Sequence, residues 1–140
     1  MLLLINTAKS QATALALIDG KKILVKREFP GQYHQSEKLL PALQNMLQSV
    51  GAAWPQLRAV GVVSGPGSFT ALRLGVVTAN TLAWALRISV IGLRLSPADT
   101  LNTLVNQLIR RSAQAKFPTL VAPVYGQAPS ISQRKNQFNL

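Results

Sequence analysis

Residues 60–75 read Val60-Gly-Val-Val-Ser-Gly-Pro-Gly-Ser-Phe-Thr-Ala-Leu-Arg-Leu-Gly75, and the other segments of the chain can be placed around them. The β-branched run at the start is typical of a buried strand. The Gly-Pro-Gly sequence ends that strand, because glycine adopts backbone angles that other residues avoid and proline cannot donate a ladder hydrogen bond. From Phe69 to Leu86 there is no proline and a single glycine. The stretch therefore predicts a strand, a tight turn and a long helix, with Ser68 or Thr70 as its N-cap.

The predicted helix at 68–86 carries apolar side chains on nearly all sides. One side packs on a sheet, and the other needs cover either from the same domain or from a partner chain. Both alternatives stay open at this point. Residues 74–93 are long enough to span a membrane, but Asn80, Arg87 and the strand-like residues 88–92 argue for a soluble helix followed by a strand.

The turn before this helix has a second interpretation, in which it faces a phosphate bound at the helix N-terminus. The residues concerned would be Gly65, Gly67 and Ser68. The third glycine of a dinucleotide fingerprint and the Lys-Ser/Thr pair of a P-loop are both absent, which disfavours this interpretation.

Composition limits the classes of protein to consider. The 140 residues suffice for one domain. The absence of cysteine excludes disulfides and thiolate metal sites. Fifteen Lys and Arg against four Asp and Glu give a net charge of +11, which suits either a polyanionic partner or a solvated basic surface. The N-terminal sequence lacks the basic region of a signal peptide, so we expect a cytoplasmic protein.

The remaining segments predict a mixed α/β fold. We expect three meander strands with a hairpin turn at Asp19-Gly20, and two further parallel strands, giving a five-stranded sheet with helices packed outside. Ser36 and Ser96 are the expected N-caps of two more helices. The predicted strands are 2–6, 13–18, 23–29, 60–63 and 88–92, the predicted helices are 36–50, 68–86 and 96–111, and residues 117–124 are a candidate last strand. Residues 1–112 would form one lobe, and 113–140 a short remnant strand with a flexible basic tail.

Three segments resemble the TsaB family, the non-catalytic subunits of the bacterial machinery that makes threonylcarbamoyladenosine in tRNA. They are Leu3-Leu-Ile-Asn-Thr7, His34-Gln-Ser-Glu-Lys-Leu-Leu-Pro41 and, most specifically, Gly65-Pro-Gly-Ser-Phe-Thr-Ala-Leu-Arg-Leu-Gly75. The resemblance covers about residues 1–100 and implies the N-terminal lobe of an actin-like, ribonuclease-H-like fold, with a much shortened second lobe. Asn6 stands where the family usually has aspartate, and Ala71 where it usually has glycine.

The resemblance implies a scaffold that pairs with a TsaD-like catalytic subunit, is joined by a TsaE-like ATPase, forms a homodimer when alone and meets tRNA only indirectly. It implies no membrane partner and no cofactor of the isolated chain, although a nucleotide at the partner interface stays open. The helices at 36–50 and 68–86 would supply the contact surface. The expected interface residues are Leu39, Leu43, Met46, Leu72, Arg73, Val76, Ala79, Asn80 and Ala83.

The acidic residues give an independent indication against catalysis. General acid/base or metal chemistry needs spare carboxylates, but each of the four is expected at a turn, a strand end or the first turn of a helix. His34 is the only histidine, which excludes a two-histidine metal motif. A Ser-His-Asp triad with Ser36 or Ser68 lacks an obvious orienting acid. We therefore predict no catalytic residues and no metal site. The alternatives are a basic RNA-binding module and a stand-alone homodimer, and an actin-like ATPase or metallopeptidase is disfavoured.

Overall fold

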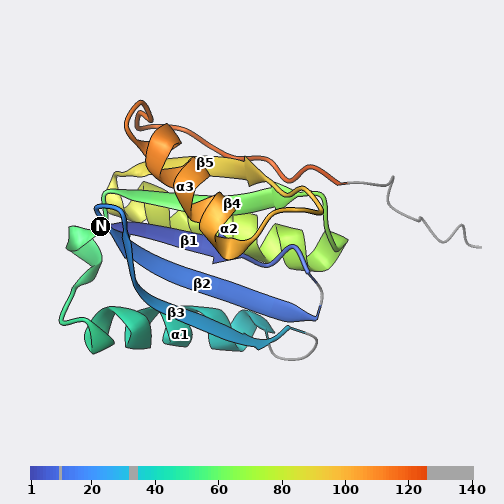
Figure 1. Cartoon of the computed structure of the whole chain (residues 1–140), viewed down its shortest axis with the longest axis horizontal. Helices are drawn as coiled ribbons and strands as arrows, with labels where there is room; N and C mark the ends of the chain where they lie inside the picture. Colours follow the sequence, from blue (N-terminus) through green and yellow to red (C-terminus); the bar gives the residue numbers. More distant parts are fainter. Residues whose placement is uncertain (10, 32–34, 126–140) are drawn as a thin grey trace, which may run out of the picture.

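The computed structural model describes residues 1–9, 11–31 and 35–125. Three strands come first in this part of the chain, and three α-helices then alternate with two further strands, with one short 3₁₀ turn after the first helix (Figure 1). The elements are β1 (Leu2–Asn6), β2 (Ala12–Asp19), β3 (Lys22–Pro30), α1 (Gln35–Ser49), η1 (Trp54–Gln56), β4 (Ala59–Gly65), α2 (Phe69–Leu86), β5 (Ser89–Arg94) and α3 (Leu101–Ser112).

The strands form one mixed sheet in the order β3-β2-β1-β4-β5. The meander strands β1, β2 and β3 pair antiparallel, whereas β1, β4 and β5 pair parallel. Gly20 has a φ of 59° in the tight turn between β2 and β3, a conformation that favours glycine. The predicted hairpin turn and the five-stranded mixed sheet are confirmed.

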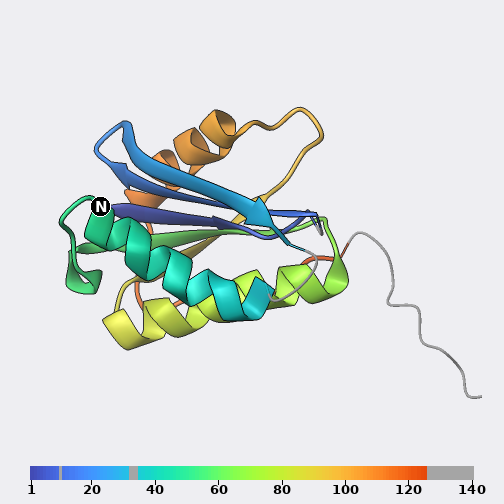
Figure 2. The same cartoon turned by 90° about the horizontal axis from the view of Figure 1, so that it is seen from below.

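Helices cover both faces of the sheet (Figures 1 and 2). Helices α1 and α2 lie on one face, where leucines of β1 and β2 and valines of β4 form the larger core with them. Helix α3 covers the opposite face through Leu104, Val105 and Leu108. Because β1 and β4 are buried on both sides, they read as continuous apolar runs in the sequence.

Two predicted helix starts are wrong. Helix α1 begins at Gln35 rather than after a Ser36 N-cap, and it continues through Pro41. Helix α3 begins at Leu101, not near Ser96. The Asp99 carboxylate accepts a hydrogen bond from the Ser96 amide at 2.7 Å and closes a turn there, and Thr100 then caps the helix in a reciprocal pair with Thr103. Asp99 thus lies before the helix rather than in its first turn.

The predicted strand at 117–124 is also wrong, since residues 113–125 contain no strand. The segment runs instead as an irregular strap beside the edge strand β5 (Figure 1). Asn80 donates to the Val121 carbonyl at 2.9 Å and accepts from the Val121 amide at 3.0 Å. The two prolines explain the irregular path, because they remove ladder donors. The tail at 126–140 lies outside the described residues.

Helix α2 is long and apolar enough to cross a membrane by length and composition alone. In the fold it packs along the sheet and buries Leu72, Val76, Ala79 and Ala83. Core helices of soluble proteins meet the same two criteria, so this property is weak evidence for a membrane span.

Candidate functional site

The carboxyl ends of the parallel strands are where α/β sheets usually bind ligands. At this edge β1 runs into the loop before β2, and β4 runs into the glycine turn before α2. The Asn6 side chain accepts a hydrogen bond from the Ala8 amide at 3.1 Å and shapes the β1–β2 loop. The Ala8 carbonyl then accepts the Ser68 amide at 3.1 Å. The two turns are therefore joined directly.

The glycines of the turn are in close contact with backbone carbonyls. Gly65 has a φ of 149° and lies against the Val124 carbonyl, so that a Cβ would collide with it. Gly67 lies in the same way against the Ala8 carbonyl. Carbonyl oxygens repel a phosphate, which favours a packing role for Gly65 and Gly67 over the phosphate-facing role considered from the sequence. Ser68 is the half-buried N-cap residue of α2, but its side chain makes no capping hydrogen bond.

The start of α2 is fixed to β1 by a buried threonine. The Thr7 hydroxyl donates to the Ala71 carbonyl at 2.5 Å. Gly75, one turn further along α2, lies directly against the same hydroxyl and leaves no room for a Cβ. Thr7, Gly67 and Gly75 therefore form one close-packed joint between the end of β1 and α2. This contact explains why residues 60–75 have glycine at positions 67 and 75.

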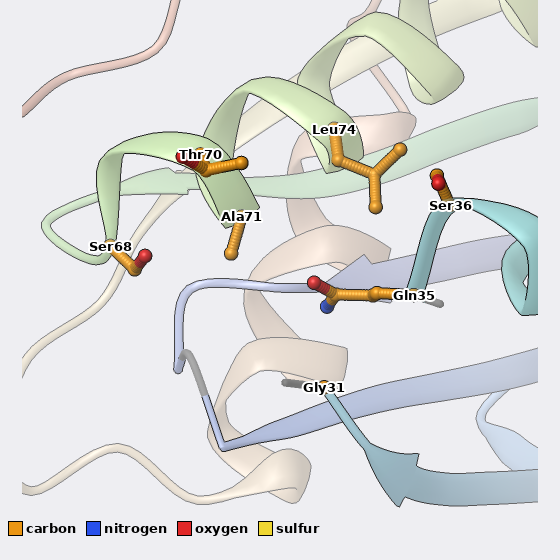
Figure 3. A pocket seen from close by; sticks show the side chains of 7 residues that line it. All are labelled: Gly31, Gln35, Ser36, Ser68, Thr70, Ala71 and Leu74. Carbon is orange, nitrogen blue, oxygen red and sulfur yellow. The ribbon is translucent and has the colours of Figure 1, made fainter. Parts of the chain in front are cut away.

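A cavity of about 440 Å³ opens between the N-terminal ends of α1 and α2 (Figure 3). Its lining is uncharged: Gly31, Gln35, Ser36, Ser68, Thr70, Ala71 and Leu74. The Gln35 amide hydrogen-bonds the Thr13 hydroxyl and so ties α1 to β2. This lining can donate and accept hydrogen bonds, but it holds no charged group that could act as an acid or base. His34, the candidate triad base, lies outside the described residues.

A smaller hollow of about 190 Å³ on the α3 side gathers Asn6, Lys9, Glu28 and Asp99. Glu28 and Asp99 were expected at separate places in the fold, and their common position on this hollow could not be predicted because about seventy residues of sequence separate them. Within residues 1–9, 11–31 and 35–125, no three His, Cys, Asp or Glu side chains are arranged to hold a metal ion.

Residues 30–131 match the family model described as "TsaD: tRNA N6-adenosine threonylcarbamoyltransferase". The chain belongs to this family. Among its relatives, the TsaB protein of Bacillus subtilis is 32% identical over 92 residues, covering 66% of this chain and 35% of that protein. The tRNA N6-adenosine threonylcarbamoyltransferase of Geobacillus kaustophilus is 29% identical over 137 residues, covering 87% and 38%.

The solved structure of YeaZ from Pseudomonas aeruginosa superposes with a TM-score of 0.62 at 26% identity. The match covers 66% of this chain and 43% of YeaZ. The TsaB resemblance and the actin-like mixed sheet are therefore confirmed. The chain spans less than half the length of each of these three relatives.

Most of the expected interface residues are buried in the chain's own core. Seven of the nine are at most 2% exposed: Leu39, Leu43, Met46, Leu72, Val76, Ala79 and Ala83. Asn80 is half-buried and holds the strap, and Arg73 is exposed. A surface that meets a partner on these helices must therefore consist of other side chains.

The outward faces of α1 and α2 carry large apolar side chains that the sequence analysis did not select. Leu40 on α1 is 50% exposed, and Val77 and Trp84 on α2 are 60% and 64% exposed. The spacing of Val77, Thr81 and Trp84 follows the outward side of the helix, opposite the buried Val76, Ala79 and Ala83. That spacing was the available signal. We call Leu40, Val77 and Trp84 the outer helical patch.

Proposed function

We propose that this chain is a non-catalytic subunit of tRNA threonylcarbamoyladenosine biosynthesis that pairs with a TsaD-like enzyme through the outer helical patch. The observation that carries the proposal is the exposure of Leu40, Val77 and Trp84 on the helical layer. Large exposed apolar side chains gathered on one layer are typical of protein interfaces, and tryptophan is the residue most enriched at their energetic centres.

The charged residues support a non-catalytic role. Glu28 and Asp99 line one hollow together with Lys9, but the Asp99 carboxylate already accepts a hydrogen bond from the Ser96 amide. The described residues that line the cavity between α1 and α2 are all neutral. Among the described residues, no three His, Cys, Asp or Glu side chains are arranged to hold the metal that a metal-assisted transfer would need.

The wider assembly follows from the same surface. We propose that the isolated chain forms a homodimer through the outer helical patch and exchanges that contact for TsaD, with a TsaE-like ATPase joining the pair. A nucleotide would bind, if at all, at the subunit interface rather than in the isolated chain. Modification of tRNA places the complex in the cytoplasm.

Size-exclusion chromatography with light scattering tests the pairing. The purified chain is mixed with TsaD from the same organism at micromolar concentrations, and a one-to-one complex is expected. Val77→Glu and Trp84→Glu would each weaken it at least about 30-fold, because an unpaired charge would be desolvated at the contact. Val77 is exposed, so Val77→Glu should keep the melting temperature of the parent chain. Trp84→Glu also loses the ring contact with Phe117, so its melting temperature is measured beside its pairing.

Leu24→Glu is the matched control, since Leu24 is also apolar and exposed but lies on the edge strand β3. It should pair with TsaD like the parent. Pairing that survives both α2 variants would refute the outer helical patch as the contact. A chain that ignores TsaD altogether would refute the proposed function.

A further inference from the structure

The amino ends of the parallel strands meet at the edge of the sheet opposite the candidate site. Residues Leu2, Ala59 and Ser89 are in register across β1, β4 and β5. The turn between β2 and β3 reaches the same edge, because Leu2 pairs with Ile18. All three helices run back toward this edge and end there, as Figures 1 and 2 show. Five chain segments thus share one rim.

This rim is strongly basic. It carries six exposed basic side chains, which we call the amino-end rim: Lys21, Lys22, Arg58, Arg87, Arg110 and Lys116. Asp19 in the hairpin is the acid at this edge. Glu28 and Asp99 line a hollow at the opposite edge, and Glu37 lies in the first turn of α1, which also starts there. The side chains of the rim therefore sum to a charge of +5, while three of the four acids of the chain lie at the opposite edge.

Stabilisation of helix ends explains only part of this charge. A helix C-terminus carries roughly half a negative charge, so three of them attract basic residues with about −1.5 in total. Six basic groups and one acid leave a clear positive excess after that compensation. Lys21, Lys22 and Arg58 lie on no helix at all, so helix dipoles give no reason for their presence.

Arg87 occupies a backbone conformation that glycine would fill more easily. It is the C-cap of α2, with φ 56° and ψ 44°, and its amide bonds back to the carbonyls of Ala83 and Trp84. Glycine is the usual residue at such a position, because it has no Cβ to strain the left-handed conformation. The Arg87 guanidinium lies 5.9 Å from the centre of the Phe117 ring. Its charge is thus held at the rim in spite of the backbone cost.

We propose that the amino-end rim binds the phosphate backbone of an RNA duplex. The choice of RNA over other polyanions rests on the proposed role in tRNA modification. From the β2–β3 turn to the start of β5 the rim crosses about 3.5 strand spacings, roughly 17 Å. At about 3.4 Å per step, this length faces on the order of five phosphates of one strand.

The expected binding is weak in sequence preference and strongly dependent on salt. If four of the six basic groups each neutralise a phosphate, log K falls with log salt at a slope of about −3.6. Affinity should then drop about 150-fold between 50 and 200 mM salt. A fluorescein-labelled tRNA transcript titrated with the purified full chain measures this slope by anisotropy.

Matched triple variants separate the rim from net charge. Lys21→Gln, Lys22→Gln and Arg58→Gln together should make the slope shallower by up to about 2.7 and weaken binding at least tenfold. Lys26→Gln, Lys38→Gln and Arg94→Gln remove the same charge from exposed sites off the rim, and should leave the slope near that of the parent. Equal losses in the two variants would overturn the proposal, as would tRNA binding that ignores salt.

Arg87→Gly removes one rim charge without damage to the fold. We expect tRNA affinity to fall severalfold while the melting temperature is unchanged or rises, so that lost binding can be told apart from unfolding.

Vesicles containing phosphatidylglycerol test whether the rim binds an anionic membrane surface instead of RNA. Rim-dependent binding to these vesicles with no binding to tRNA would overturn the assignment to RNA. TsaD pairing is measured by complex mass, so it can fail while the rim proposal stands, and the reverse also holds.

Discussion

Asn80 is the residue on which attachment of the strap at 113–125 depends most. Its amide group forms two hydrogen bonds with the backbone of Val121, at 2.9 and 3.0 Å. Asn80→Ala would remove both and leave the Val121 N–H and C=O without those partners. At about 1 kcal/mol for each bond, the attachment should lose about 2 kcal/mol, which corresponds to roughly a 30-fold increase in the open population.

Hydrogen exchange followed by mass spectrometry measures that opening. The Val124 amide, which bonds to the Ser64 carbonyl at 2.7 Å, should lose protection about 30-fold, while amides of β1 and β4 keep theirs. Thr78→Ala is the matched control, because its hydroxyl bonds within α2, to the Leu74 carbonyl, and not to the strap. Unchanged protection of Val124 in Asn80→Ala would refute the reasoning, since the strap would then be held by its other contacts.

Two further predictions concern the folding of the chain. Gly75→Ala would push a Cβ into the Thr7 hydroxyl and disturb its bond to Ala71, so we expect a loss of about 1–3 kcal/mol in unfolding free energy by urea denaturation; an unchanged midpoint would contradict the close-packed joint. Thr100→Ala removes the N-cap of α3 and should lower the free energy of unfolding by about 1 kcal/mol. Ser96→Ala, at the N-cap position expected from the sequence, should leave it nearly unchanged. A larger loss in Ser96→Ala than in Thr100→Ala would contradict a helix start at Leu101 and favour a start near Ser96.

The sequence predicted those parts of the fold that depend on neighbouring residues. The β-branched run of β4, the Asp19-Gly20 turn and the proline-free stretch of α2 each act within a few residues, and each is found where expected. The start of α3 was missed because both Ser96-Pro97 and Thr100 fit the N-cap pattern. Only the turn closed by Asp99 decides between them.

The strap and the glycine contacts could not be predicted for a different reason. Val121 meets Asn80 across 41 residues of sequence, and Val124 reaches Gly65 across a longer separation. No local pattern encodes such pairs. Gly65 could be identified as a turn glycine, but the carbonyl that lies against it could not, so the sequence alone did not separate a packing role from the phosphate-facing role.

The expected interface residues of α2 lie mostly on the side of the helix that the chain itself buries. Apolar side chains surround this helix, so periodicity alone does not tell the side that packs on the sheet from the side that meets a partner. The most regular apolar stripe of α2 consists of Val76, Ala79 and Ala83, and these side chains are buried against the chain's own core. A helix that is apolar all round therefore argues for two contacts, and the second contact that we propose lies on the side away from the regular stripe.

The strap connects this second contact to the rest of the chain. Trp84 of the outer helical patch lies 5.7 Å from the Phe117 ring, and Phe69 stacks on Tyr125 at 4.3 Å. Both partners belong to the strap, so its attachment through Asn80 also positions one edge of the patch. If TsaD contacts Trp84 in this arrangement, Asn80→Ala should weaken pairing although Asn80 itself is half-buried. If TsaD displaces the strap, the same substitution should strengthen pairing, because the strap no longer competes. The sign of that change therefore tells whether the strap forms part of the contact surface or covers it.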